Sequence, residues 1–411
     1  MTRTARRTGH SPHRSRRLGY LAAATVFAIG MAGTTLPTPL YGLYREELGF
    51  SELMVTVVFA VYAVGVIATL LVAGDHSDRA GRRPVLLYAL GLAAASAVCF
   101  LAQGGLPLLF AGRLLSGFSA GLLSGVGTVT VMELAAPEHR SRAGLAATAA
   151  NMGGLGCGPL LAGLLAEYAP LPLRTPFLVH LALVAVACVI VLLLPETVGG
   201  ARRRTPLRPR GLHVPPEVRG VFAPSALVAF AGFSLLGLFT AVAPAFLSRA
   251  LGVTDLAVAG LVVFSVFLSS TVGQSLTGRL ALDVAAPLGC LMLVVGLVLV
   301  GASLWARSMP LLVAGAVCGG LGQGLSFRAA VTALGAAAPA AHRAGTISSF
   351  FVVAYTGISL PVVGVGAMTM WLGLEEAGLT FTTCVTVLVA ATGAHLVRHR
   401  AGRPGQAGSG R

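Results

Sequence analysis

The chain has 411 residues, of which 55% are hydrophobic and only 10% are Asp, Glu, Lys or Arg, and its mean hydropathy is +0.84. Soluble domains usually carry about 25% charged residues, so this composition excludes an ordinary soluble enzyme. The formal net charge is nevertheless +15, because 29 basic residues, all of them arginine, outnumber 14 acidic ones. In a soluble chain such an excess would suggest a nucleic-acid partner, so the positions of the arginines decide what it means.

Long apolar stretches recur along the whole chain. An α-helix needs about 20 apolar residues to cross the bilayer core. The stretches that meet this length are 18–40, 54–74, 84–104, 107–130, 142–166, 176–195, 222–247, 256–278, 286–305, 310–334, 345–369 and 377–397. They are too long and continuous for the alternating strands of a membrane barrel. The sequence therefore predicts an all-α membrane protein with twelve transmembrane helices.

The arginines predict how these helices are oriented. Of the 29 arginines, 23 lie in the two tails and in the segments after helices 2, 4, 6, 8 and 10, and only four lie in the alternate loops. The positive-inside rule makes the richer side cytoplasmic, so both termini are expected in the cytoplasm of a multi-pass inner-membrane protein. The positive charge then indicates contact with anionic membrane lipid, and nucleic-acid binding is not expected. Trp305 and Trp371 fall at the expected outer ends of helices 9 and 11, at the headgroup boundary.

A charged, Pro-rich segment at 196–221 divides the helices into six and six, and it is expected to be a flexible cytoplasmic linker. The expected organisation is a disordered basic tail at 1–17, bundles at 18–195 and 222–398, and a tail at 399–411. The bundles share an internal repeat with an offset of 202, in which the first-half residues Gly117, Pro137 and Pro159 recur as Gly319, Pro339 and Pro361. Repeated halves predict two pseudo-symmetric six-helix bundles with a binding site between them, as in secondary transporters.

The loop between helices 2 and 3 combines two glycines, which permit a tight turn, with two aspartates and three arginines. It resembles the signature loop of the major facilitator superfamily, Gly-x-Leu-Ala-Asp-Arg-x-Gly-Arg-Arg/Lys, although His76 replaces the usual leucine. The matching residues are Gly74, Asp78, Arg79, Gly81, Arg82 and Arg83. The resemblance, which extends over residues 18–398, implies a transporter that works by alternating access. It also implies that this loop is a conformational latch, with Asp78 facing residues 344–347 at the start of helix 11 in the outward-facing state.

Helix 4 carries Arg113-x-x-x-Gly117, which is similar to a pattern of the same family. A charge inside a span is costly unless it faces a partner or a water-filled cavity, so Arg113 is a candidate for substrate or proton handling. The alternative is that Arg113 reaches the membrane surface, since it lies about 9 Å inside Pro107. Arg328 in helix 10 is interpreted in that second way. Glu133, one of the few acids near a span, is the other candidate for proton handling.

Helix 5 contains a stripe of small residues that resembles the antiporter motif of proton-coupled drug exporters, with Ala162 in place of one glycine. The stripe consists of Asn151, Gly154, Gly158, Pro159 and Gly163. Small residues on one face let a neighbouring helix approach closely. The expected partner is a stripe in helix 8 made of Ser265, Ser269, Gly273 and Thr277. General helix packing is the alternative explanation. The resemblance favours export over uptake.

Four polar or aromatic residues are candidates for lining a substrate cavity, although each is equally explained by helix packing: Tyr41, His180, Gln323 and Tyr355. No pattern indicates a metal site, a disulfide framework, a cofactor or an enzyme. The sequence therefore predicts a monomeric secondary active transporter for a small organic molecule, with proton-coupled efflux of a hydrophobic or cationic compound as the leading function. A sugar or metabolite uptake symporter and a non-transporting receptor of the same fold are the alternatives.

Overall fold

The computed structural model describes residues 12–72, 77, 80–102, 104–198 and 212–401. Within these residues twelve helices are long and apolar enough to cross a membrane, and each coincides with one of the expected stretches. This confirms the all-α fold with twelve membrane-spanning helices. Apart from Leu171 and Leu212, the large apolar side chains that stay exposed lie on these same helices, as a surface in contact with lipid requires.

The first half consists of α1 (Pro12–Thr35), η1 (Thr38–Leu40), α2 (Tyr41–Leu48), α3 (Glu52–Val72), α5 (Arg82–Leu101), α6 (Leu106–Leu134), η2 (Pro137–His139), α7 (Arg140–Thr148), η3 (Ala149–Gly153), α8 (Gly154–Tyr168) and α9 (Thr175–Leu193). Helix 1 is thus α1 to α2, with its break at Pro37 and Pro39, where proline removes backbone N–H donors. Helix 5 is η2 to α8, and η3 within it is a single π-helical turn.

The second half consists of η4 (Pro216–Val218), α10 (Arg219–Ala241), α11 (Ala243–Ala250), α12 (Leu256–Thr277), α13 (Leu282–Ala306), α14 (Met309–Ala337), α15 (Arg343–Leu372) and α16 (Leu374–Ala401). Asp255 caps α12, since its carboxylate accepts the N–H groups of Ala257 and Val258 at 2.8 and 3.0 Å. The internal repeat is visible in α6 and α14, which both have 29 residues and both begin with a proline in the first turn.

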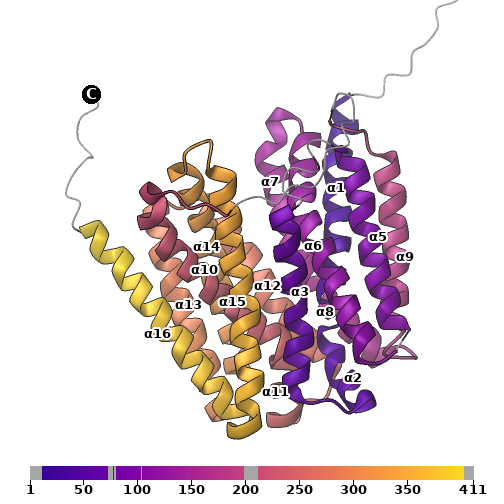
Figure 1. Ribbon diagram of the computed structural model, residues 1–411, viewed down its shortest axis with the longest axis vertical. Coiled ribbons are helices and arrows are strands. Elements are labelled where there is room, and N and C mark those ends of the chain that lie inside the picture. The colour runs from indigo at the N-terminus through magenta and orange to yellow at the C-terminus, as the bar shows by residue number, and fades with distance from the viewer. Residues whose placement is uncertain (1–11, 73–76, 78–79, 103, 199–211, 402–411) are drawn as a thin grey trace, which may run out of the picture.

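The two halves stand side by side as separate bundles (Figure 1), and α1 begins and α16 ends at the same end of the molecule. We call this end, where α6 leads into α7 and α14 into α15, the arginine-rich end. The other end, which carries α2 and α11, is the opposite end. Contacts between the halves are made mainly by α3 with α15 and by α8 with α12.

The helix boundaries differ from the expected organisation at three places. The helix α1 begins at Pro12, inside the segment 1–17 that was expected to be disordered. The helix α10 begins at Arg219, three residues before the expected 222, and α16 continues to Ala401. Most of the expected linker, residues 199–211, and three members of the expected latch, Gly74, Asp78 and Arg79, lie outside the described residues.

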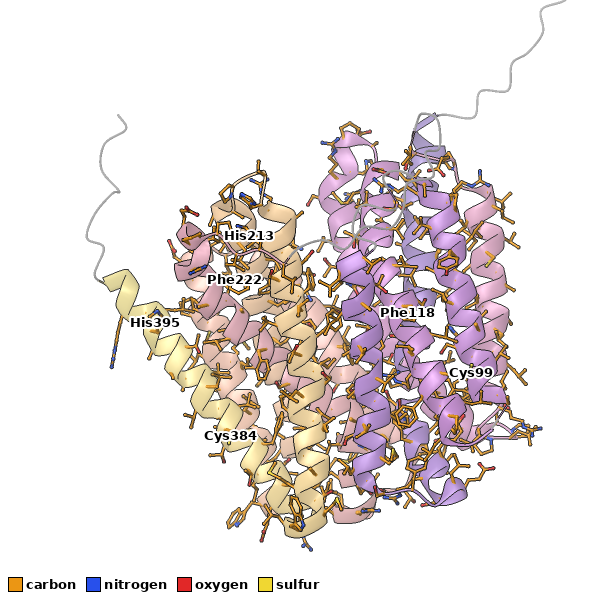
Figure 2. The ribbon with its side chains drawn as sticks, viewed as in Figure 1. Cys99, Phe118, His213, Phe222, Cys384 and His395 are labelled. Atoms are coloured by element: carbon orange, nitrogen blue, oxygen red, sulfur yellow. The ribbon has the colours of Figure 1, made fainter. Side chains whose placement is uncertain are left out.

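Side chains on the outside of the bundle match an apolar environment. Trp305 and Trp371 end α13 and α15 at the opposite end, and they are 82% and 81% exposed, as expected for indoles at a headgroup boundary. The six cysteines are free thiols, and two of them, Cys99 and Cys384, lie far apart on the outer helices α5 and α16 (Figure 2).

Candidate functional site

Arg113 is the largest side chain with under 2% exposure, at 1%, and it lies in α6 within the membrane-spanning part of the first half. Its guanidinium donates to the backbone carbonyls of Thr34 in α1 and Phe59 in α3, at 2.5 and 3.3 Å. The same group lies over the rings of Phe59 and Tyr62, 5.3 and 4.8 Å from their centroids. The structure therefore places Arg113 inward, and the alternative in which it reaches the membrane surface is wrong.

Gly117 explains how Tyr62 comes to lie against Arg113. A Cβ atom added at Gly117 would collide with the backbone carbonyl of Tyr62, and one added at Gly65 would collide with the carbonyl of Leu114. The two glycines therefore let α3 and α6 approach at backbone distance. The arginine and the glycine of the Arg-x-x-x-Gly pattern thus contact the same residue of α3. Gly117 lies against the backbone of Tyr62, and the guanidinium of Arg113 lies over the Tyr62 ring.

Tyr62 also connects this site to the second half. Its ring meets that of Tyr355 in α15 edge-on, with the ring centroids 6.3 Å apart. Tyr355 continues into an aromatic cluster of Phe233 and Phe351, with ring centroids 5.5 and 6.5 Å from its own. Arg113 therefore lies one ring away from the interface between the halves, which is where the repeat predicts a binding site.

From this level α3 and α15 separate towards the arginine-rich end. A cavity of about 520 Å³ opens there between α3 and α6 of the first half and α15 of the second. Its walls include Thr69 and Gly121 on one side and Ser348 and Phe351 on the other. Ser77, in the loop after helix 2, and Ala344 both line this cavity, so the start of α15 faces an open space on the side of the expected latch.

The opposite end is closed by contacts between the halves. Glu52 of α3 pairs with Arg249 of α11 at 2.7 Å and also with Arg45 of α2. Glu167 at the end of α8 accepts the backbone N–H of Leu256 at 2.9 Å. The residues that make these contacts also line a smaller cavity of about 390 Å³. The molecule is thus open at its arginine-rich end and closed at the other.

Helix 5 packs between two helices by means of its glycines. A Cβ atom at Gly154 or Gly158 would collide with backbone carbonyls of α1, those of Ala28 and Ala32. A Cβ atom at Gly163 would collide with the carbonyl of Leu256 in α12, in the other half. The predicted stripe is therefore a packing surface along its length, and its last glycine contributes to closure of the opposite end.

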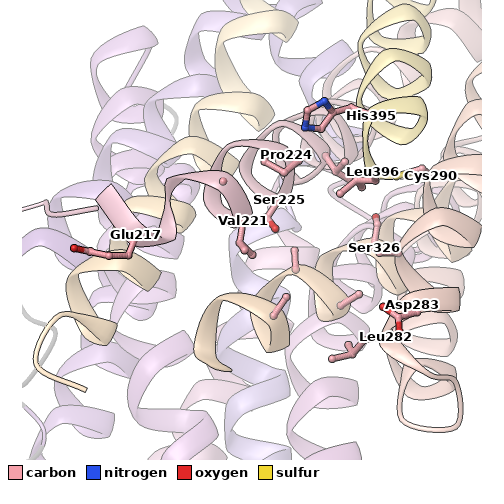
Figure 3. Close-up of a pocket in the computed structure, with 16 residues that line it drawn as sticks. Glu217, Val221, Pro224, Ser225, Leu282, Asp283, Cys290, Ser326, His395 and Leu396 are labelled. Atoms are coloured by element: carbon pink, nitrogen blue, oxygen red, sulfur yellow. The ribbon is translucent and has the colours of Figure 1, made fainter. Parts of the chain in front are cut away.

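A third cavity, of about 1020 Å³, lies wholly within the second half among α10, α13, α14 and α16 (Figure 3). Its polar lining includes Glu217, Asp283, Ser326 and His395. Since none of its walls belongs to the first half, it does not have the place between repeats that alternating access requires. Within the described part of the chain, no cluster of three or more His, Cys, Asp or Glu side chains could hold a metal ion.

Comparison with known proteins agrees with this architecture. The family model of the Major Facilitator Superfamily matches residues 21–361. The chain belongs to the major facilitator superfamily. The family resemblance is thereby confirmed, and the matched range includes the loop after helix 2, the Arg113 pattern, helix 5 and the repeat.

Individual members of the superfamily are more distant. A segment of 85 residues is 41% identical to the multidrug resistance protein MdtL of Escherichia coli K12 / DH10B and also of Shigella boydii, but it covers 20% of this chain and 22% of that relative. A bacterial homologue of the human lysosomal transporter Spinster, solved in an inward-facing and unoccupied conformation, has a TM-score of 0.70 at 16% identity over 97% of this chain and 100% of that chain. The human organic anion transporter MFSD10 has a TM-score of 0.65 at 18% identity, over 94% and 100%.

The described part of the superfamily loop is a network within the first half. Arg82 is 6% exposed and donates to both carboxylate oxygens of Glu133, at 2.9 and 3.2 Å, and to Ser77 at 2.6 Å. Glu196 accepts the backbone N–H groups of Arg82 and Arg83, at 2.8 and 3.2 Å, at the start of α5. Gly81, at φ 97°, makes the turn that brings these groups together. Glu133 is therefore an exposed ion-pair partner at the end of α6, not a carboxylate in a cavity.

The expected pairing of the helix 5 stripe with Ser265, Ser269 and Gly273 of helix 8 is wrong. A Cβ atom at Gly273 would collide with the carbonyl of Leu321 in α14, so this face of α12 packs within its own half. The glycine of α12 that meets helix 5 is Gly260, which lies against the carbonyl of Pro159. Small-residue spacing identifies a close-packed face but does not identify the helix that covers it.

The remaining candidates lie apart from one another. His180 in α9 is 2% exposed and lies against Gly33 of α1, within the first half. Gln323 in α14 is 1% exposed and accepts a hydrogen bond from Ser270 at 2.6 Å, within the second half. Tyr41 lines the cavity near the opposite end. Tyr355 lies against Tyr62, one of the two aromatic rings beside Arg113.

Two residues of the site were not singled out from the sequence, namely Tyr62 and Glu196. Tyr62 sits in a continuous apolar run, and its one distinguishing signal is a position three residues before Gly65, which packs against α6. Glu196 directly follows a span and precedes the arginine-rich segment, so it was included in the linker.

Proposed function

We propose that this protein is a carrier, not an enzyme, that exports an amphipathic organic compound by alternating access in exchange for protons. The arginine-rich end faces the cytoplasm in this proposal, so both termini are cytoplasmic and the protein lies in the inner membrane as a monomer. The positive-inside rule supports this orientation, and it places the arginines where they would contact anionic lipid. The structure then corresponds to an inward-facing state.

The observation that carries the proposal is the asymmetry of access. The cavity of about 520 Å³ opens between the halves at the arginine-rich end, while Glu52–Arg249 and the Gly163–Leu256 contact close the opposite end. A site between two repeated halves that is reached from one side is what a rocking carrier needs. The aromatic rings of Tyr62, Tyr355 and Phe351 give the inner end of this route an apolar character.

The direction of transport rests on helix 5. Its glycine stripe resembles the antiporter motif, and one segment of the chain resembles a protein named for multidrug resistance. Proton exchange is proposed on the same resemblance. No Asp or Glu among the described residues is buried, and Glu133 is paired with Arg82. His180 is the buried imidazole available for proton exchange.

Transport into inverted membrane vesicles tests the proposal. The probes are three dansyl amphiphiles with one fluorophore and different headgroups: dansylglycine (a carboxylate), dansylamide (neutral) and a dansyl derivative with a trimethylammonium group. Export by proton exchange predicts that at least one probe accumulates when the vesicle lumen is acidic and that accumulation stops when the pH gradient is collapsed. Vesicles without the protein provide the background.

Two other outcomes would overturn the proposal. Loss of a preloaded probe from vesicles with an acidic lumen would indicate uptake by symport, which moves protons and substrate in the same direction. Absence of protein-dependent flux for all three probes, with or without a gradient, would favour the non-transporting receptor.

A further inference from the structure

Arg113 is a buried cation whose charge is not balanced by an acid. Its guanidinium contacts two backbone carbonyls and two aromatic rings, and no described Asp or Glu forms an ion pair with it. Its Nε atom, a further donor, has no hydrogen-bond partner among the described residues. Buried charges are normally paired with an opposite charge, so the positive charge of Arg113 lacks its usual counter-ion.

The residues around Arg113 connect this unpaired positive charge with the proposed transport route. Tyr62, which covers the guanidinium, contacts Tyr355 of the other half, and Tyr355 contacts Phe351 in the wall of the cytoplasmic cavity. Along α6, Arg113 lies eight residues from Gly121 of the same cavity, which corresponds to about 12 Å. The aromatic rings therefore separate the cavity from a cation that lies directly behind them.

The charges that line the two inter-half cavities differ in sign. Arg343 is the one charged side chain among the described residues that line the cytoplasmic cavity. The cavity at the opposite end is lined by two arginines and by four carboxylates, those of Glu46, Glu52, Glu167 and Asp255. An anion would be attracted from the cytoplasmic side towards Arg343 and Arg113, and it would be repelled from re-entering at the other side.

We infer that the transported compound is an organic anion, an amphiphile whose carboxylate, sulfonate or phosphate group pairs with Arg113 while its apolar body lies against the aromatic rings of Tyr62 and Tyr355. This inference rests on the export function proposed above, and it replaces the hydrophobic or cationic compound expected from the sequence with an anionic amphiphile. The anion supplies the charge that Arg113 lacks, and an arginine fork binds such groups in a bidentate manner. Rotation of Tyr62 and Tyr355 away from each other opens the way to it.

The three dansyl probes test this inference, because they differ only in headgroup charge. We expect wild-type protein to accumulate dansylglycine about tenfold faster than dansylamide, since a hydrogen bond to a charged group corresponds to about that factor or more. The trimethylammonium probe should be the slowest. In Arg113→Gln the ratio of dansylglycine flux to dansylamide flux should fall by about tenfold, whereas Arg113→Lys should retain more of the preference.

Arg279→Gln is the matched control. It removes the same charge from an exposed position in the second half, so the flux ratio should stay at the wild-type value. Preference of the wild-type protein for the neutral or cationic probe overturns the inference while leaving export intact, and so does an unchanged ratio in Arg113→Gln. Absence of flux for every probe is instead a failure of the proposed function. Wild-type selectivity decides the matter even if Arg113→Gln does not fold.

Discussion

At the arginine-rich end of the first half, the carboxylate of Glu196 holds the start of α5 by accepting backbone hydrogen bonds. Burial alone would raise the pKa of Glu196, but the backbone N–H groups of Arg82, Val198, Arg83 and Thr197 donate to its carboxylate and hold that pKa below its ordinary value. The charged form is therefore favoured by folding. Its contribution to stability is present above the ordinary pKa of 4.5 and is lost as the pH falls through the lowered value.

Glu196→Gln should accordingly lower the thermal unfolding temperature at neutral pH and weaken the decline of that temperature as the pH falls below about 4.5. Differential scanning fluorimetry of the purified protein between pH 3 and pH 8 measures both effects. Glu217→Gln is the control, because Glu217 is exposed and accepts no hydrogen bond within the described part of the chain. A Glu196→Gln curve parallel to the wild-type curve at all pH values would contradict the assignment.

At the scale of helices, helix 5 depends on a glycine that has no room for a side chain. Gly158 lies against the carbonyl of Ala32 and the hydroxyl of Thr35 in α1, and the neighbouring Leu155 carbonyl accepts a hydrogen bond from that hydroxyl at 2.6 Å. A methyl group at Gly158 must displace backbone. A larger residue at Gly158 therefore requires α1 to shift.

We therefore expect Gly158→Ala to destabilise the protein by about 1–3 kcal/mol, the usual cost of overpacking, and to lower transport in proportion to the loss of folded protein. Gly153→Ala is a matched control in the same helix, since an added Cβ atom at Gly153 meets no neighbour within 4 Å. Thermal unfolding of both variants, followed by flux per folded molecule, tests this. Equal stability of the two variants would contradict this expectation and would show that α1 moves to accommodate the added methyl group at no cost.

The same helix shows what could be predicted from the sequence and what could not. The twelve spans were predictable because bilayer thickness fixes their length. The repeat predicted the two halves because glycine and proline positions recur, at an offset of 202, from α6 to α8 and from α14 to α15. Which helix covers Gly158 was not predictable, because periodicity assigns residues to a face but does not assign the face to a neighbour. The π-helical turn at Ala149–Gly153 and the pairing of Tyr62 with Arg113 depend on tertiary contacts that leave no signal in an apolar run.

At the scale of the whole molecule, contacts between the halves are unevenly distributed. Backbone-to-backbone approaches of Gly163 to Leu256 and of Gly260 to Pro159 lie towards the opposite end, together with the Glu52–Arg249 ion pair. Near the arginine-rich end, Arg328 reaches the hydroxyl of Thr148 at 3.5 Å, which is at the limit of a hydrogen bond. If the halves rock as rigid bodies about Tyr62 and Tyr355, the contacts at the opposite end would break and close contacts would form at the arginine-rich end.

Gly163→Ala should shift this equilibrium towards the outward-facing state, because the added methyl group must push α8 away from the backbone of α12. Pairs of spin labels at introduced cysteines report the two ends in a background without the six native cysteines. Gly42→Cys with Ser248→Cys spans the opposite-end cavity, and Gly125→Cys with Ser348→Cys spans the cavity at the arginine-rich end. The first distance should lengthen and the second should shorten together, since rigid halves cannot open one end without closing the other.

Gly364→Ala, where a Cβ atom meets open space, is the control and should leave both distance distributions unchanged. A change at one end alone would exclude rocking of rigid halves and would indicate local bending of α8.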